Sequence, residues 1–470
     1  MKLSKHKLGE LIEVTRGASL SGQFYAEEGE FVRLTLGNFN MNGGGFKENT
    51  SKTDLYYTGT VKDEFILNKD DIITPLTEQS LGLLGTTARI PESGKYIQSQ
   101  DVALVKCKKG LLDPNFCYYL ISSSVVHQQL SAGAQQTKIR HTSPDKIKDC
   151  TVWIPELEVQ KRIGRILYDI DEKIALNRQI NDNLEAMAKQ LYDYWFVQFD
   201  FPNEEGKPYK SSGGAMVWNE KLKREIPKGW SVKNLEQIAT SYQQGLIRSN
   251  NQLSTDSKYG YLKMGDLDGK GQYTLQGLTR TNATNEEVDL FSLHKGDFLI
   301  NVRNSKEIVG KTCLIGYVER NTLYNHMLVR LDFKDVSTFY MNLLFNSEFM
   351  YKALDGLKQG TTTVIALYQN DLYRLPILVP APCVMEQFSK ITDSILDQKE
   401  IISYEIEELT KQRDDLLPLL MNGQATVNYH LSVLFITKIM LYYKETNINF
   451  RYERNNNTKR FRWNESGSVC

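Results

Sequence analysis

The chain has 470 residues, which is too long for one small hydrophobic core and predicts two to four domains. Hydrophobic residues make up 41% and charged residues 24%, a globular composition that excludes wholesale disorder. Lysine plus arginine and aspartate plus glutamate both number 57, so the formal net charge is zero. This balance counts mildly against nucleic-acid binding, which normally leaves a basic footprint, although a neutral total can hide a basic face.

The six cysteines are scattered, with no CxxC pair. A zinc site or a disulfide framework is therefore not expected, and the pattern suits a reducing compartment. The N-terminal segment has no apolar run of the kind found in signal peptides. The apolar stretch from Leu431 to Tyr443 is interrupted by Lys438 and is too short to cross a bilayer. We expect a soluble, cytoplasmic protein without a membrane partner.

An internal repeat is the strongest pattern in the sequence. Short segments of the first half resemble segments of the second half in the same order, separated by 225 to 228 residues. The clearest matches are Leu8–Ile12 with Leu235–Ala239, Leu34–Asn38 with Leu262–Asp266, Leu67–Ile72 with Leu293–Phe298, and Leu84–Ala88 with Val309–Cys313. The order and the nearly constant separation predict a duplicated fold.

Each half begins with short β-type runs between Gly, Asn and Asp turns, for example Phe31–Leu36, Asp71–Thr74 and Val102–Lys106. A short helix is expected next, over about 114–130 in the first half and 338–354 in the second. A long helical segment then closes each half. The fold class is therefore mixed α/β (α+β), with two similar globules that each lead into a long helix.

The long helices carry apolar residues at seven-residue steps. The steps fall on Ile163, Ile170, Asn177, Leu184 and Leu191 in the first helix, and on Phe388, Ile395, Ile402, Leu409 and Leu416 in the second. Sustained heptads favour a coiled coil, and the duplication favours an antiparallel pair with pseudo-two-fold symmetry. Asn177, at a core position, is expected to set the register. Packing of each helix on its own globule, or homodimerisation, remains an alternative.

No catalytic constellation stands out. An adenine methyltransferase needs an Asn/Asp-Pro-Pro-aromatic loop to hold the flipped base, and the sequence has no Pro-Pro. Gly310-Lys311-Thr312 is like the end of a phosphate loop, but Ser305 stands where that loop needs glycine. The six histidines show no metal-ligand spacing. The pattern indicates a binding protein with no metal site and no catalytic residues.

Several segments resemble the specificity subunits of type I restriction–modification systems. The resemblance is carried by Tyr194–Pro202, Gly206–Tyr209, Ile226–Trp230, Pro155 to Gln160, Gly133–Ile139 and Leu416–Gly423. It covers about residues 1–425 and is diffuse inside the globules. The segment Gly360–Ile365 is one residue shorter than its counterpart in the first half.

The resemblance implies a non-catalytic subunit that holds two target-recognition domains apart on paired helices. It implies double-stranded DNA as a partner, together with methyltransferase subunits, two of them, and restriction/translocase subunits. Those partners use S-adenosylmethionine, ATP and Mg, and this chain itself needs no cofactor. On this basis we expect target-recognition domains at 1–154 and 234–380, spacer helices at 155–200 and 381–424, a linker at 201–233, and a tail of unknown role at 425–470.

Base edges are expected to be read by polar loop residues outside the repeat consensus. Asn and Gln can pair with adenine, Arg with guanine, and Asp with cytosine. The candidates are Asn38, Asn40, Asn42, Gln79, Ser80, Gln98, Ser99 and Gln100 in the first half, and Asp266, Asp268, Arg303, Asn304, Asn325 and His326 in the second. Each of these is also an ordinary type of turn residue.

A second set is better suited to phosphate contacts, because lysine and arginine supply charge and hydroxyl or amide groups donate hydrogen bonds. Its members are Gln135, Gln136, Thr137, Lys138, Arg140, Lys358, Gln359, Thr361 and Thr362. A basic run at Asn455–Arg460 in the tail is either a weak phosphate-contacting arm or an appendage without function.

The loops of the two halves differ chemically. Thr74–Gln79 has no likeness to Ile300–Ser305, so the two halves are expected to read different half-sites of an asymmetric bipartite target, with the helix length fixing the spacer. Two alternatives remain open. One is a coiled-coil scaffold that binds proteins, and the other is a specificity module for a fused methyltransferase–nuclease system.

Overall fold

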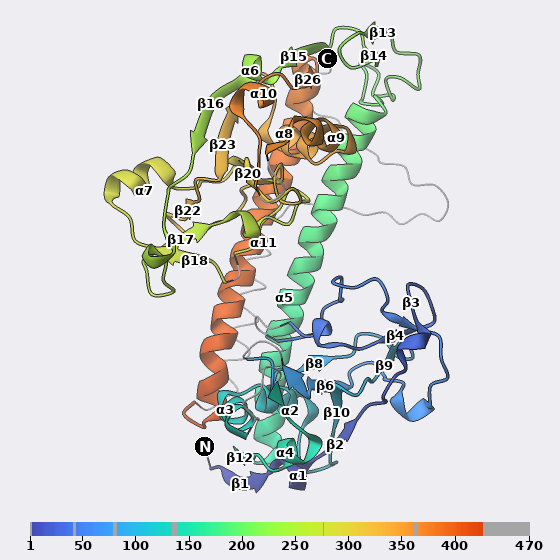
Figure 1. The fold of residues 1–470 in the computed structure, drawn as a ribbon, viewed down its shortest axis with the longest axis vertical. Helices are drawn as coiled ribbons and strands as arrows, with labels where there is room; N and C mark the ends of the chain where they lie inside the picture. The colour runs from blue at the N-terminus through green and yellow to red at the C-terminus, as the bar shows by residue number, and fades with distance from the viewer. Residues whose placement is uncertain are drawn as a thin grey trace. The chain divides into compact units, whose positions relative to one another are not determined.

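The computed structural model describes residues 2–40, 44–78, 82–133, 140–275, 277–360 and 364–425. The chain divides into two compact units. Of the described residues, unit 1 comprises 2–175 and 408–425, and unit 2 comprises 176–407. The division passes through both long helices, so each unit includes its own globule and a part of each helix (Figure 1). The sequence-based boundaries, in contrast, separate globules from helices.

Unit 1 is built around a four-stranded antiparallel sheet in the order β2-β10-β6-β8. A two-stranded sheet, β1-β12, and a small sheet, β3-β5-β4-β9, flank it. Its elements are β1 (Ser4–Lys7), α1 (Leu8–Leu11), β2 (Ile12–Arg16), β3 (Tyr25–Ala26), β4 (Phe31–Arg33), β5 (Tyr56–Tyr57), β6 (Ile72–Pro75), β7 (Thr77–Glu78), β8 (Ala88–Arg89), β9 (Tyr96–Ile97), β10 (Val102–Cys107), α2 (Pro114–Ile121), α3 (Ser124–Gly133), β11 (Arg140–His141), α4 (Pro144–Lys148) and β12 (Thr151–Ile154).

Unit 2 has the same plan, with a four-stranded sheet in the order β16-β23-β19-β21 and a pair β15-β26. Its elements are β13 (Met216–Asn219), β14 (Arg224–Pro227), β15 (Ser231–Asn234), α6 (Leu235–Ile238), β16 (Ala239–Gln244), β17 (Tyr259–Leu262), β18 (Thr279–Thr281), α7 (Asn285–Phe291), β19 (Phe298–Asn301), β20 (Arg303–Asn304), β21 (Thr312–Leu314), β22 (Leu323–Tyr324), β23 (Leu328–Phe333), α8 (Thr338–Phe345), α9 (Glu348–Leu357), β24 (Gln359–Gly360), β25 (Ile365–Ala366), α10 (Gln369–Leu372) and β26 (Pro376–Val379).

The predicted repeat is present in the pairing of the strands. A parallel pair, β4 with β9, has its counterpart in the parallel pair β17 with β22. The parallel bridge from Ala18 to Ser99 corresponds to that from Leu246 to Asn325. Beside these bridges a glycine is required in each unit. A Cβ on Gly17 would lie 2.4 Å from the carbonyl oxygen of Gln98, and one on Gly245 would lie 2.3 Å from that of Tyr324.

The short helix predicted in each half is two helices in the structure. In unit 2 the break follows Phe345, and the Oγ atom of Ser347 accepts a hydrogen bond from the N–H of Met350, 3.3 Å away. A serine that caps a new N-terminus in this way starts a second helix in a new direction. In unit 1, α2 ends at Ile121 and α3 begins at Ser124.

The long helices are α5 (Leu157–Tyr192), which ends in a π-helical turn at Asp193–Val197, and α11 (Pro382–Met421). Within unit 2, hydrogen bonds join Asn177 to Glu405 and Asn181 to Ser403, and an ion pair joins Glu185 to Lys399. As the residue numbers rise along α5, those of the partner residues on α11 fall, so the two helices run antiparallel (Figure 1). The antiparallel pairing predicted from the heptads is confirmed.

Seven of the ten heptad residues are buried, while Leu191, Ile402 and Leu416 are half-buried. Ile163, Ile170, Asn177 and Leu184 are buried on α5, as are Phe388, Ile395 and Leu409 on α11. The aromatic Tyr194–Pro202 segment of the sequence also has a packing role, since Trp195 and Phe196 enter the main core of unit 2. The ring of Phe196 contacts those of Tyr340 and Phe388 with centroids 4.8 Å away in both cases. None of the described helices combines the length and the hydropathy needed to cross a membrane.

Candidate nucleic-acid interface

In each unit, two loop regions that are far apart in the sequence meet in a small sheet. In unit 1, β7 pairs with β11, so that Glu78 lies opposite Arg140. In unit 2, β20 and β24 both pair with β25, so that Arg303 and Gln359 share Ala366 as their partner. The structure therefore brings a predicted base-reading segment beside a predicted phosphate-contacting segment in both units.

The backbone of the small sheet is anchored in the same way in the two units. In unit 2 the N–H of Val302 donates to the carbonyl of Met327 at 2.9 Å, and the N–H of Leu367 donates to the carbonyl of Val302 at 2.8 Å. In unit 1 Leu76 makes the equivalent bonds with Asp101 and Thr142, both at 2.8 Å. The N–H and C=O groups of Leu76 and Val302 are thus all hydrogen-bonded, which fixes the backbone just before Thr77 and Arg303.

Arg303 is exposed, and its backbone N–H donates to Oδ1 of the buried Asn301 at 3.1 Å. The guanidinium makes no hydrogen bond or ion pair with the residues that the structure describes. His326 lies close by, and its buried Nδ1 atom has no hydrogen-bond partner among those residues. Burial and the positive charge of Arg303 lower the pKa of His326, so its ring is neutral at pH 7.

Lys358 and Gln359 use their polar groups inside unit 2. The ammonium of Lys358 donates to the carbonyl of Lys306 at 3.0 Å and pairs with Asp355 at 3.2 Å, and only 5% of its side chain is exposed. Nε2 of Gln359 donates to Oδ2 of Asp371 at 2.8 Å. Both contacts hold β24 in place, and a phosphate would have to compete with them.

Unit 1 has a buried ion pair at the corresponding sheet. Glu78 is 1% exposed, and its Oε2 atom accepts the N–H groups of Gly82, Leu83 and Leu84 at 3.2, 3.0 and 3.0 Å. Its Oε1 atom lies 3.1 Å from a guanidinium nitrogen of Arg140, without the alignment of a hydrogen bond. The carboxylate thus holds the backbone of Gly82–Leu84 in place, and Arg140 balances the buried charge.

A family model for the type I restriction modification DNA specificity domain matches the chain twice, over residues 2–186 and 227–411. Together the two matches cover more than half of the chain. The chain belongs to this family. Each match contains one globule and part of the long helix that follows it, so the family unit corresponds to the internal repeat.

Individual members of the specificity family are similar over most of their length. The type I restriction enzyme MjaIX specificity subunit of Methanocaldococcus jannaschii is 23% identical over 68% of this chain and 71% of its own. The HindI specificity subunit of Haemophilus influenzae is 22% identical over 70% of this chain and 81% of its own. A crystal structure of the type I restriction–modification S subunit from M. genitalium, 15% identical, has the same fold with a TM-score of 0.51, covering 90% of this chain and 96% of that one.

Two base-reading candidates of this specificity chain occupy one repeated position and have a capping role there. The carboxamide Oδ1 of Asn38 accepts the N–H of Thr35 at 2.9 Å, and the carboxylate of Asp266 accepts the N–H of Lys263 at 2.7 Å. Burial raises the pKa of Asp266. Asp268 likewise accepts two backbone N–H groups of its own turn, from Lys270 and Gln272.

Three more candidates bind groups within the fold. Gln98 is buried and donates to the carbonyls of Thr15 and Val102 at 2.8 and 2.9 Å. The amide of Asn325 donates to the hydroxyl of Tyr261 at 3.0 Å. Oδ1 of Asn304 accepts the N–H of Ser305 at 2.7 Å.

Other candidates are placed differently. Gln100 is exposed, Asn40 is half-buried, and Ser99 pairs through its backbone with Ala18. The remaining candidates lie outside the described residues: Asn42, Gln79, Ser80, Gln135, Gln136, Thr137, Lys138, Thr361 and Thr362. The tail beyond Ala425 lies outside them too.

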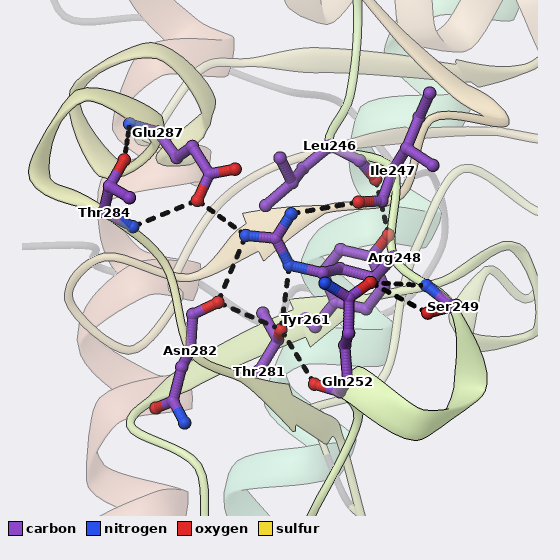
Figure 2. A network of polar contacts seen from close by, with 10 residues as sticks. All are labelled: Leu246, Ile247, Arg248, Ser249, Gln252, Tyr261, Thr281, Asn282, Thr284 and Glu287. Carbon is purple, nitrogen blue, oxygen red and sulfur yellow. Dashed lines mark hydrogen bonds and ion pairs between the residues drawn. The ribbon is translucent and has the colours of Figure 1, made fainter.

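Arg248, which no sequence pattern singles out, organises the loops of unit 2, and 10% of its side chain is exposed. Figure 2 shows Arg248 pointing into a ring of acceptors from separate segments, with Glu287 at 2.6 Å, the hydroxyl of Thr281 at 3.2 Å and the carbonyl of Asn282 at 3.1 Å. Its neighbour Ile247 is 71% exposed. In unit 1 a different residue, Arg33, makes the comparable contact with Asp54 at 3.2 Å. A lone arginine among turn residues gives no periodic signal, so only the structure reveals this role.

Proposed function

We propose that the chain is the non-catalytic DNA sequence-recognition subunit of a type I restriction–modification complex. Each unit reads one half of a bipartite target. The proposal rests on the repeat itself: one backbone arrangement carries different side chains at the same positions. Thr77 and Arg303 are equivalent, as are Glu78 and Asn304, because each pair occupies the same place in the small sheet of its unit.

Different side chains on the same backbone favour an asymmetric target. At the position where unit 2 presents the half-buried His326, unit 1 presents the exposed Gln100, since Ser99 and Asn325 form the equivalent parallel bridges. Glutamine, histidine and arginine offer base edges different patterns of donors and acceptors. Two symmetric half-sites would require the same groups at both positions.

We assign the chemistry to partner subunits. The relatives are named as specificity subunits of restriction enzymes. No group of three or more His, Cys, Asp or Glu that could hold a metal ion occurs within the described residues. We propose double-stranded DNA as the ligand, two methyltransferase subunits that use S-adenosylmethionine, and restriction subunits that use ATP and Mg. In this arrangement the partners also supply part of the positive charge that contacts the DNA phosphates, because this chain has no net charge.

Filter binding of the chain, alone and in complex with a co-expressed methyltransferase subunit, tests the proposal. The complex should bind DNA that carries the target more tightly than DNA that lacks it. Between 50 and 200 mM salt the affinity should fall on the order of a thousand-fold, because phosphate contacts release counterions. A chain that binds the methyltransferase subunit but gives the complex no preference among DNA sequences would instead be a protein-binding scaffold.

A further inference from the structure

Four of the six base-reading candidates in unit 2 already have hydrogen-bond partners inside the unit. Asp266 and Asp268 cap turns, Asn304 binds Ser305 and Asn325 binds Tyr261. Of the six base-reading candidates in unit 2, only Arg303 and His326 have side chains that make no hydrogen bond with the described residues. A base edge has to find unused donors or acceptors, so these two positions are the ones prepared for a ligand.

Arg303 is also held in a fixed place. Its own N–H is bound by Asn301, whose amide donates in turn to the carbonyl of Ile308 at 3.2 Å. The neighbouring Val302 is bound on both sides, by Met327 and by Leu367. A side chain on a rigid strand loses less freedom on binding than one on a mobile loop, so more of its contact energy is available for discrimination.

The surroundings leave Arg303 as a charged group with unused donors. His326 is neutral beside it and does not repel it, and no acidic side chain pairs with it among the described residues. The guanidinium fork carries five N–H donors in a plane, which match two adjacent acceptors on one ligand. In the major groove of DNA, the O6 and N7 atoms of guanine form such a pair.

We propose that Arg303 reads a guanine in the half-site recognised by unit 2. This inference rests on the proposed DNA-recognition function. A phosphate also presents two acceptors to a guanidinium, but a phosphate contact carries no sequence information. The equivalent residue of unit 1 is Thr77, which is 5% exposed. The half-site of unit 1 therefore lacks this arginine–guanine contact.

The test is methylome sequencing of cells that express the methyltransferase subunit with the wild-type chain, with Arg303→Ala or with Arg303→Lys. We expect Arg303→Ala to relax the motif at one G·C position of one half-site, with discrimination there falling about ten- to hundred-fold. Arg303→Lys should weaken discrimination at the same position, because an ammonium lacks the rigid planar fork of the guanidinium. Arg320→Ala is the matched control, an exposed arginine of unit 2 outside the small sheet, and should leave the motif unchanged.

The outcomes separate the two proposals. If the wild-type chain directs no bipartite motif, the proposed function itself fails. If it does and the Arg303 variants keep every motif position, the guanine assignment alone is wrong. Where Arg303→Ala abolishes methylation, binding of the purified complex is measured on the wild-type target and on targets changed at each G·C pair of that half-site. Loss of preference at one pair supports the assignment, and a uniform loss of affinity identifies a phosphate contact and overturns it.

Discussion

Asp266 and Asn38 use the same acceptor geometry at the same place in the two units, yet only one of them carries a charge. The Asp266 carboxylate gains a hydrogen bond from the N–H of Lys263, while burial disfavours its ionised form and raises its pKa above the ordinary value of 3.8. Asn38 shows that a carboxamide is sufficient for the cap. Asp266→Asn therefore places in unit 2 the residue type that already caps the equivalent turn of unit 1.

We expect Asp266→Asn to raise the stability of unit 2 at pH 7 by a few tenths of a kcal/mol. In the pH range between 3.8 and the raised pKa, the folded state binds more protons than the unfolded state, so wild-type stability falls as the pH rises through that range. The advantage of the variant should therefore be absent below this range and complete above it. Urea denaturation from pH 3.5 to 8 measures it, and a difference that is constant across pH would contradict the linkage.

Glu78 is the residue in unit 1 whose loss should have the largest local effect. Glu78→Ala removes the acceptor of three backbone N–H groups and leaves Arg140 without its partner. We expect a loss of about 3 kcal/mol and faster hydrogen exchange, at least about ten-fold, at the amides of Leu83 and Leu84. Glu92→Ala, at an exposed site of the same unit, is the control and should leave those amides unchanged. Equal exchange in both variants would rule out the anchoring role.

At the scale of elements, the long helices were predictable because a seven-residue period is sustained over many turns. Their bounds differ from the expected ones by a few residues, with α5 at Leu157–Tyr192 followed by a π-helical turn to Val197. The loops were less predictable. Asn38, Gln98 and Asn325 have the residue types of base readers, but whether their amides point outward depends on contacts with Thr35, Thr15 and Tyr261 that no local pattern encodes.

The ion pair between Glu185 of α5 and Lys399 of α11 tests the pairing of the helices. Both side chains are about four-fifths buried, so Glu185→Lys or Lys399→Glu alone places like charges together and should destabilise unit 2. The double exchange should restore most of the loss, with a coupling energy of about 1 kcal/mol. Exchanging Glu386 and Lys390, an exposed pair within α11, should give a coupling below about 0.5 kcal/mol. Strictly additive effects at Glu185 and Lys399 would show that the helices do not pair there.

If the helix pair sets the distance between half-sites, its length should change the spacer of the target. We expect one heptad inserted into each helix, between Asn177 and Asn181 and between Ser403 and Glu405, to lengthen the pair by about 10 Å. That corresponds to a spacer longer by about three base pairs, with both half-sites retained. The same insertion in α5 alone should abolish recognition, because the contacts Asn177–Glu405 and Asn181–Ser403 can then no longer form together. A methylome with an unchanged spacer after the double insertion would show that the length of the helix pair does not set the distance between the half-sites.

At the scale of the whole molecule, the chain is a duplicated fold whose two halves have diverged. The sheets β2-β10-β6-β8 and β16-β23-β19-β21 and the backbone anchors of the small sheets are the shared part. The diverged part comprises Thr77 and Arg303, Gln100 and His326, and the arginines Arg33 and Arg248 that hold the loops. Such a chain should be modular, so that one unit can be exchanged without changing what the other unit recognises.

The methylome of cells that express the methyltransferase subunit with this chain tests that claim most directly. We expect a single asymmetric motif of two half-sites separated by a spacer. Replacing residues 1–150 by the same region of another family member should change one half-site and leave the other half-site as it was. A change in both half-sites, or a single uninterrupted symmetric motif, would contradict the account.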